Sequence, residues 1–228
     1  MRLSKRMHMV ADMVTPGKVL ADIGCDHGYL SVWLVREKTV SRAIAMDLRE
    51  GPLSKAKESI TFFHQDDVIE TRLSDGMDEL VPGEADRIVI AGMGGILMRD
   101  ILKRGQACCD MAEQLVLQPQ SDSELVRAEV QKQGFRIEDE RACYEDGKYY
   151  IAFACVKGTE ENPYSETELK YGRILGEKRD EVFLSFLREE LEKKELMQSR
   201  LIGAGTEAAE QRLKTLGEEI DSIRAIIQ

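Results

Sequence analysis

Apolar residues in the first two thirds of the chain occur either in short continuous runs or at helical spacing. The short runs predict strands at 19–23, 42–47, 68–73, 86–91 and 114–117. Helical spacing and helix-start residues predict helices at 3–14, 29–35, 51–60 and 96–103. Strands that alternate with helices in this way predict an α/β fold with a parallel sheet and right-handed crossovers.

The pattern changes after the fifth predicted strand. Two longer runs, 135–144 and 149–157, flank a turn of sequence EDGK, which predicts an antiparallel hairpin at the edge of the sheet. The whole arrangement is a Rossmann-like sheet that is mostly parallel and ends in an antiparallel hairpin.

The C-terminal part has a different composition, rich in Glu, Lys, Arg and Leu, after a boundary at Asn162-Pro163. Two helices are predicted at about 165–201 and 207–227, separated by the Gly-Ala-Gly of 203–205. Their apolar residues alternate three- and four-residue steps, as in the seam of a coiled coil. These are Leu184, Leu187 and Leu191 in the first helix, and Leu213, Leu216, Ile220, Ile223 and Ile227 in the second. We therefore expect a domain at 1–160 and an antiparallel coiled-coil hairpin at 161–228.

Composition limits the class of protein. The 228 residues are 43% hydrophobic, yet no apolar run is long enough to span a membrane and the N-terminus lacks a signal core, so a cytoplasmic protein is expected. The five cysteines form no C-x-x-C pair and the three histidines are scattered. Neither a disulfide framework nor a metal site is predicted.

The net charge of −10 argues against a protein that coats nucleic acid. Residues 1–18 are an exception with a local charge of +3, from Arg2, Lys5, Arg6 and Lys18 against Asp12. This basic helix could contact phosphates or be an ordinary solvated face. Residues 164–228 carry eleven basic and fourteen acidic side chains, which is typical of a solvated coiled coil and not of a general phosphate clamp.

The turn after the first strand, DIGCDHG, gives the main indication of function. Glycines such as Gly24 let the backbone pass close to a ligand, and Asp22 can bind an ammonium group. A dinucleotide site would have G-x-G-x-x-G, whereas this chain has Asp26 at the middle glycine position. That carboxylate would repel a pyrophosphate and attract a sulfonium or ammonium group, which disfavours NAD and favours S-adenosylmethionine.

Two further strands end on carboxylates. Asp47 follows Gly24 by 23 residues, at the place where an acidic residue binds ribose hydroxyls in nucleoside-binding folds. Asp75, before Gly76, is placed to accept a hydrogen bond from an adenine amino group. Each could alone be a helix cap or turn residue, but the three acidic strand ends together favour the cofactor interpretation.

The fourth strand ends in IAGMGG. Enzymes that methylate the exocyclic amine of adenine typically carry an Asn- or Asp-Pro-Pro-aromatic motif here, so N6 methylation is disfavoured. Small residues leave room for a base, and Met93 offers an adaptable apolar wall, although a tight strand-to-helix turn would use the same residues.

The segments VLADIGCDHGYL, AMD, SDG, IAGMGG and the opening LSKR together resemble the bacterial tRNA (adenine22-N1)-methyltransferase family. The resemblance covers nearly the whole chain. It implies a class I methyltransferase fold with a C-terminal coiled-coil hairpin, S-adenosylmethionine as donor, and methylation of N1 of an adenine in tRNA. The general class I pattern has glycine at the position of Asp26, so this turn follows the narrower family. The cofactor-binding residues expected are Asp22, Gly24, Cys25, Asp26, Gly28, Asp47, Leu48, Asp75, Gly76, Ala91 and Gly92.

Attack by adenine N1 needs no strong base, because the neutral ring offers a lone pair and the product is cationic. A carboxylate beside the base could stabilise that charge, and Asp26 is the first candidate. His27, Tyr29 and Met93 are its expected neighbours, although His27 could equally be a loop residue and Tyr29 a core residue. Because N1 lies on the Watson–Crick edge, the base must be unpaired or flipped. Arg2, Lys5 and Arg6 are the candidate tRNA contacts.

Three other functions remain open at this point. A small-molecule methyltransferase would have the same cofactor site, a closed pocket and no affinity for tRNA. A non-catalytic scaffold would bind the cofactor and recruit a protein partner through the coiled coil. A dehydrogenase is the least favoured, because of Asp26.

Overall fold

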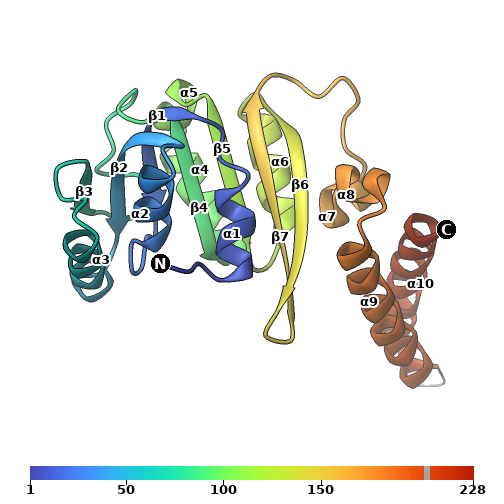
Figure 1. Cartoon of the computed structure of the whole chain (residues 1–228). Coiled ribbons are helices and arrows are strands. Elements are labelled where there is room, and N and C mark those ends of the chain that lie inside the picture. Colours follow the sequence, from blue (N-terminus) through green and yellow to red (C-terminus); the bar gives the residue numbers. More distant parts are fainter. Residues whose placement is uncertain (203–205) are drawn as a thin grey trace. The chain divides into compact units, whose positions relative to one another are not determined.

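Seven strands form one sheet in the order β3-β2-β1-β4-β5-β7-β6 in the computed structural model (Figure 1), which describes residues 1–202 and 206–228. Their bounds are Gly17–Ile23 for β1, Val40–Asp47 for β2, Ile69–Leu73 for β3, Arg87–Met93 for β4, Gln114–Pro119 for β5, Phe135–Glu145 for β6 and Lys148–Lys157 for β7. The first five strands pair in parallel, and β7 is antiparallel to both β5 and β6. The predicted Rossmann-like sheet with a terminal hairpin is confirmed.

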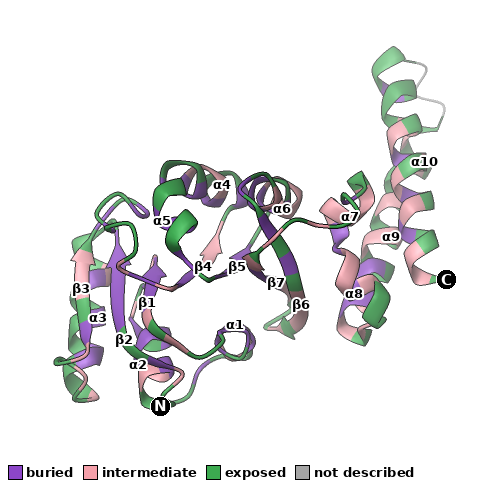
Figure 2. Ribbon diagram, turned by 90° about the horizontal axis from the view of Figure 1, so that it is seen from above, coloured by how far each residue is buried: buried purple, intermediate pink, exposed green. Residues whose placement is uncertain are grey.

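Helices cover both faces of this sheet. Figure 2 shows α1, α2 and α3 on one side and α4, α5 and α6 on the other. Their bounds are Lys5–Ala11 for α1, Tyr29–Arg36 for α2, Glu50–Phe62 for α3, Gly95–Arg104 for α4, Gln106–Met111 for α5 and Ser123–Lys132 for α6. The sequence pattern missed α5 and α6, because α5 has only six residues and the buried side of α6 includes Arg127 and Glu129 beside two valines.

The central strands are buried on both faces, and this explains their continuous apolar sequences. In β1 the side chains from Leu20 to Ile23 are all buried, including Asp22. In β5 every residue from Gln114 to Pro119 is buried. A buried polar side chain at the end of such a strand is costly unless it is hydrogen-bonded or serves a ligand, so Asp22 stands out.

The first predicted C-terminal helix, 165–201, is wrong as a single element. It is divided into α7 (Glu166–Tyr171), α8 (Arg173–Lys178) and α9 (Glu181–Leu201). The breaks lie at Gly172 and Arg179, whose φ angles of 95° and 50° cannot belong to a right-handed helix. Asp180 then caps α9 by accepting a hydrogen bond from the backbone N–H of Phe183.

Helices α9 and α10 (Glu207–Ile227) pack against each other through the predicted apolar seam. The buried residues are Leu184 and Leu187 of α9, with Phe183, and Leu216, Ile220 and Ile223 of α10. Lys194 pairs with Glu219, and three residues further along α9 the sulfur of Met197 accepts from Arg212, which comes earlier in α10, so the contacts run in opposite directions along the two helices. The pair is therefore an antiparallel hairpin. The predicted glycine break at 203–205 lies outside the described residues.

The chain divides into two compact units, Met1–Tyr171 and Gly172–Gln228. The predicted division was after residue 160. Helix α7 joins the first unit because Arg127 of α6 donates a hydrogen bond to the carbonyl oxygen of Leu169 at 2.8 Å. Among the described residues, no helix is both long and apolar enough to cross a membrane.

Candidate functional site

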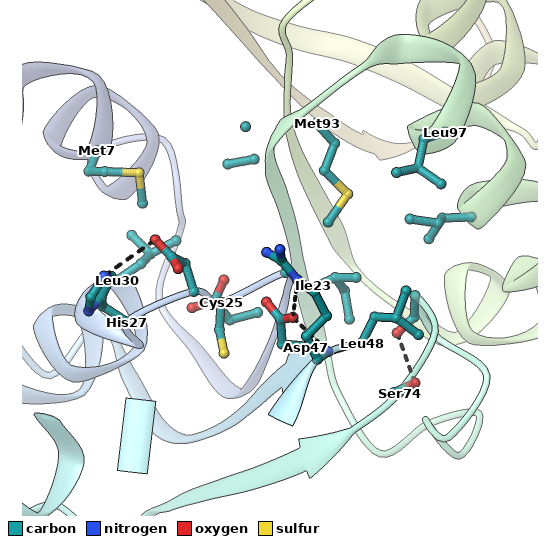
Figure 3. Close-up of a pocket in the computed structure, with 18 of the residues that line it drawn as sticks. Met7, Ile23, Cys25, His27, Leu30, Asp47, Leu48, Ser74, Met93 and Leu97 are labelled. Carbon is teal, nitrogen blue, oxygen red and sulfur yellow. Dashed lines mark hydrogen bonds and ion pairs between the residues drawn. The ribbon is translucent and has the colours of Figure 1, made fainter. Parts of the chain in front are cut away.

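A cavity of about 580 Å³ opens at the carboxyl ends of the parallel strands (Figure 3). Its walls come from the ends of β1, β2 and β4, the turns after β1 and β3, the residue after β5, and helices α1, α2 and α4. Every residue predicted for the site lines this cavity except Gly28. The parallel topology explains this grouping, because it brings the carboxyl ends of neighbouring strands to one edge of the sheet.

Gly24 forms the floor of the cavity next to β1. Its φ of 76° is in the left-handed region, and the terminal methyl of Met93 occupies the space that a Cβ would need. The backbone N–H groups of Gly24 and Cys25 both donate to the carbonyl oxygen of Met46, at 2.8 and 2.9 Å. These bonds tie the turn to β2 and fix the close approach of backbone to cavity.

Asp26 and Gly28 complete this turn in different ways. Asp26 has a φ of 49°, a left-handed conformation that Asp tolerates better than most residues, which explains how it replaces the glycine of the general pattern. Its carboxylate is exposed and lines the cavity. Gly28 precedes α2 with a φ of 67° and packs against Ala56 of α3, where a Cβ would approach the Ala56 Cβ to 3.1 Å. Its position in the structure supports helix packing.

Asp22 is the buried acid of the site. Its Oδ2 accepts a hydrogen bond from Ser31 Oγ at 2.7 Å. Burial raises the pKa of Asp22 to about 6, against the lowering effect of the Ser31 hydrogen bonds, and the negative charge of Asp47 adds to the rise. Burial, followed by the charges of Asp22 and Asp47, also raises the pKa of the Cys25 thiol. Cys25 therefore stays protonated at neutral pH and is unsuited to act as a nucleophile.

Asp47 and Asp75 lie at the next two strand ends. Asp47 is buried, and its Oδ1 accepts a hydrogen bond from the backbone N–H of Arg49 at 3.0 Å. Asp75 is more exposed and pairs with Arg104 of α4 through hydrogen bonds of 2.9 and 3.2 Å. The Arg104 hydrogen bond lowers the pKa of Asp75, so its carboxylate is an ionised acceptor. Sequence reasoning did not anticipate this pairing.

The IAGMGG segment forms an irregular strand end. The expected strand stopped at Ala91, but β4 continues through Gly92 to Met93, and its register against β5 shifts between Ala91 and Met93. Gly92 has a φ of 79°, and such a bulge redirects the following side chain. Figure 3 shows Met93, Met7 and Leu97 along one side of the cavity, facing Cys25, Asp47 and Ser74 on the other.

The outer part of the cavity contains Asp26, His27 and Tyr29. The His27 Nε2 lies 3.8 Å from Asp26 Oδ2. The imidazole is also stacked on Tyr29, with ring centroids 5.5 Å apart and planes 5° apart. Tyr29 is exposed, so it is not the core residue that its position one turn into a helix could have indicated. These three side chains form a polar and aromatic rim.

Arg6 is the main cavity residue whose placement the sequence did not indicate. Its Nη1 donates to Gln118 Oε1 at 3.0 Å, and its guanidinium lies 5.5 Å from the ring centre of Tyr150. The carboxylate of Glu145, at the β6–β7 turn, accepts from the N–H groups of Lys5 and Arg6 and so anchors the start of α1. Gln120, just after β5, was also missed, although the ends of parallel strands are the usual place for such residues.

The strand order and the acidic cavity at the carboxyl edge define a Rossmann-like methyltransferase domain. Residues 3–153 match the family described as "Methyltransferase domain". The tRNA (adenine(22)-N(1))-methyltransferase of Bacillus subtilis (strain 168) is 33% identical over 232 aligned residues, which cover 100% of this chain and 98% of that protein. The chain belongs to the tRNA (adenine(22)-N(1))-methyltransferase family.

Solved structures agree over the full length. The crystal structure of the B. subtilis M1A22 tRNA methyltransferase superposes with a TM-score of 0.92 at 31% identity, covering 100% of this chain and 99% of that one. The Streptococcus pneumoniae protein Sp1610, crystallised in complex with S-adenosyl-L-methionine, gives a TM-score of 0.89 at 29% identity, with 100% of both chains covered. The similarity therefore includes the C-terminal helices as well as the sheet.

Proposed function

We propose that this protein transfers the methyl group of S-adenosylmethionine to N1 of adenine 22 in tRNA, in the cytoplasm. The observation that carries the proposal is one cavity lined by three strand-end carboxylates and Arg6, with the exposed Asp26 and Tyr29 and the half-buried His27 at its rim. The inner groups match the polar groups of the cofactor, and the rim leaves space for a base to approach from outside.

The chemistry of the inner cavity fits the cofactor group by group. Asp22 suits the ammonium of the methionine portion, and Arg6 suits its carboxylate. Asp47 suits the ribose hydroxyls, and Asp75, kept ionised by Arg104, suits the adenine amine. Backbone and small or apolar groups between them, from Gly24, Cys25, Leu48, Gly76, Ala91 and Gly92, would pack against the nucleoside. A volume of about 580 Å³ lies within the usual range for a small-molecule site.

S-adenosylmethionine supplies a methyl group on a positively charged sulfonium centre, which the lone pair of adenine N1 can attack as the carbon–sulfur bond breaks. The adenine ring gains the positive charge, and no proton has to leave. The protein's task is therefore to position the base and to stabilise the charge that develops on it.

Asp26 is the group best placed for that stabilisation. Its exposed carboxylate can accept a hydrogen bond from the adenine amine while facing the ring that becomes cationic. The stacked pair of His27 and Tyr29 can hold the flipped base by ring contact, and Met93 can form the opposite apolar wall. These roles make Asp26, His27, Tyr29 and Met93 the residues of the reaction centre.

The three candidate tRNA contacts differ in whether they face the cavity or the solvent. Arg6 faces inward to Gln118 and Tyr150, so we assign it to the cofactor. Arg2 and Lys5 are exposed and remain the proposed phosphate contacts of α1 and the segment before it. A small-molecule substrate would favour a buried reaction centre, and the exposure of Asp26 and Tyr29 favours a macromolecular substrate instead.

The test is incubation of the purified protein with methyl-labelled S-adenosylmethionine and bulk bacterial tRNA, followed by nucleoside analysis. Label in 1-methyladenosine is the expected result. Label in N6-methyladenosine would contradict the target atom. Cofactor binding without any labelled RNA would favour the small-molecule or scaffold alternative.

A further inference from the structure

A second cavity, of about 470 Å³, lies beside the first and shares Tyr29 with it. Its wall includes Arg2, Tyr29, Glu58, Ser59, Phe62 and Phe63, and we call it the aromatic cleft. We propose that the aromatic cleft binds the base of an RNA nucleotide adjacent to the target adenosine. The proposal rests on the proposed function and extends it to a second nucleotide of the same substrate.

Phe62 is exposed and does not contribute to the buried face of its helix. The buried face of α3 consists of Leu53, Ala56, Ser59 and Ile60, and Phe62 lies off that face with 75% of its surface exposed. Its contact with Phe63 is edge-to-face, with centroids 5.0 Å apart. An exposed aromatic in the wall of a cavity has a face available for stacking on a flat ligand.

Tyr29 makes the cleft continuous with the reaction centre. Its ring, parallel to His27, contributes to the walls of both cavities. A base held at Asp26 in the first cavity would therefore have its neighbour in the chain within reach of the second. Extruding the target base removes a stacking partner from that neighbour, and an aromatic side chain can replace it.

The charges around the cleft favour RNA over a peptide or an apolar ligand. Arg2 belongs to the wall, and the guanidinium of Arg36 lies 5.2 Å from the ring centre of Phe63. Against Arg2 and Arg36, the acidic residue of the wall is Glu58, which leaves a local balance of two minus one, or +1, on a chain of net charge −10. Cations beside stacking rings are the combination that single-stranded nucleic acids recognise.

Substitution at Phe62 tests the proposal. Phe62→Ala is expected to weaken tRNA binding, measured by fluorescence anisotropy, and to lower kcat/KM for tRNA, each by roughly tenfold. Affinity for S-adenosylhomocysteine should change by less than about twofold. The Phe62→Trp variant should bind tRNA about as tightly as the wild type. The Phe62→Leu variant should bind as weakly as Phe62→Ala, because leucine keeps apolar surface without a flat ring. Val81→Ala, at an exposed apolar residue outside both cavities, is the matched control.

A base-level readout separates stacking from a structural effect. The tRNA is labelled with 2-aminopurine at the nucleotide on either side of adenine 22. One of the two labels should change in fluorescence on binding to the wild type and to Phe62→Trp, and much less with Phe62→Ala at saturating protein. An equal change with Phe62→Ala would overturn the proposal.

The failure of the two proposals can be distinguished. If the wild type binds tRNA but transfers no methyl group, the proposed function fails, while the affinity ratio of Phe62→Ala to wild type still decides the cleft. If the wild type methylates tRNA and Phe62→Ala matches it in affinity and kcat/KM, the cleft proposal fails alone. Absence of tRNA binding by the wild type overturns both.

Discussion

Ser31 Oγ donates a hydrogen bond of 2.7 Å to Asp22 Oδ2, and both side chains are buried, with Asp22 in the wall of the cavity. The hydrogen bonds from the side chain and the backbone of Ser31 only partly offset the effect of burial, since the pKa of Asp22 remains raised to about 6. A carboxylate kept in such a position is costly for folding and useful for a cationic ligand.

Cofactor affinity is expected to depend on the ionisation of Asp22. The ammonium of the cofactor is attracted to the carboxylate and not to the neutral acid, so affinity should fall as the pH drops below about 6. The loss should approach about tenfold per pH unit. Titration calorimetry with S-adenosylhomocysteine between pH 5 and pH 8 (about three units around this pKa) measures it.

The Asp22→Asn variant should bind the cofactor more weakly than the wild type at high pH. Its affinity should change little with pH. His27→Gln is the control, because the His27 imidazole lines the same cavity. If the pH dependence of cofactor affinity were unchanged in Asp22→Asn and lost in His27→Gln, its cause would be His27 and not Asp22.

The same raised pKa predicts a stability effect of opposite sign. Between the ordinary pKa of 3.8 and the folded value of about 6, the folded protein holds the Asp22 proton more tightly than the unfolded chain does. Stability contributed by the protonated acid is therefore lost as the pH rises through this window. Asp22→Asn should raise the free energy of unfolding of the ligand-free protein at pH 8, by about 1–3 kcal/mol. Urea denaturation at pH 8 tests this, and lower stability of the variant would refute it.

Asp26→Ala is expected to lower the rate of methyl transfer far more than the affinity for tRNA. The carboxylate is proposed to act on charge that develops during the reaction, and loss of such a group typically costs about 100-fold in rate. Single-turnover kinetics measure the rate of methyl transfer, and fluorescence anisotropy measures the affinity for tRNA. Asp12→Ala, at an exposed carboxylate outside the cavity, should change neither. Equal losses in rate and affinity after Asp26→Ala would mean that Asp26 binds tRNA without assisting the reaction.

Arg127 and Glu140 form an ion pair at 2.8 Å with both side chains 0% exposed. Replacing Glu140 with Gln leaves the buried guanidinium without its counter-charge, and such a loss typically destabilises by about 3–5 kcal/mol. Glu138→Gln is a matched control on the same strand, because its partner Arg136 and Glu138 itself are both 45% exposed. That change should cost less than about 1 kcal/mol. Comparable losses in the two variants would contradict this account of the buried pair.

The acidic strand ends could be predicted from sequence because they depend on topology alone. Once strands and helices alternate, Asp22, Asp47 and Asp75 must come to the same edge of a parallel sheet. The cavity that they line is consistent with that inference. The roles assigned to the individual side chains stay predictions.

Other features depend on contacts that no local pattern contains. Arg6 reaches the cavity because Glu145, distant in sequence, anchors the start of α1. Asp75 pairs with Arg104 only because α4 passes beside the turn after β3. The break at Arg179 uses a left-handed conformation at a residue that gives no sequence signal for it.

The proposed reaction methylates one atom at one position, and the sharpest test uses two tRNA transcripts that differ only at nucleotide 22. Wild-type protein, S-adenosylmethionine and either transcript are incubated, and 1-methyladenosine is mapped by primer extension and mass spectrometry. We expect one 1-methyladenosine per molecule, at position 22, and none when adenine 22 is replaced by guanine. Equal methylation of both transcripts, or of neither while the cofactor binds, would contradict the proposed function.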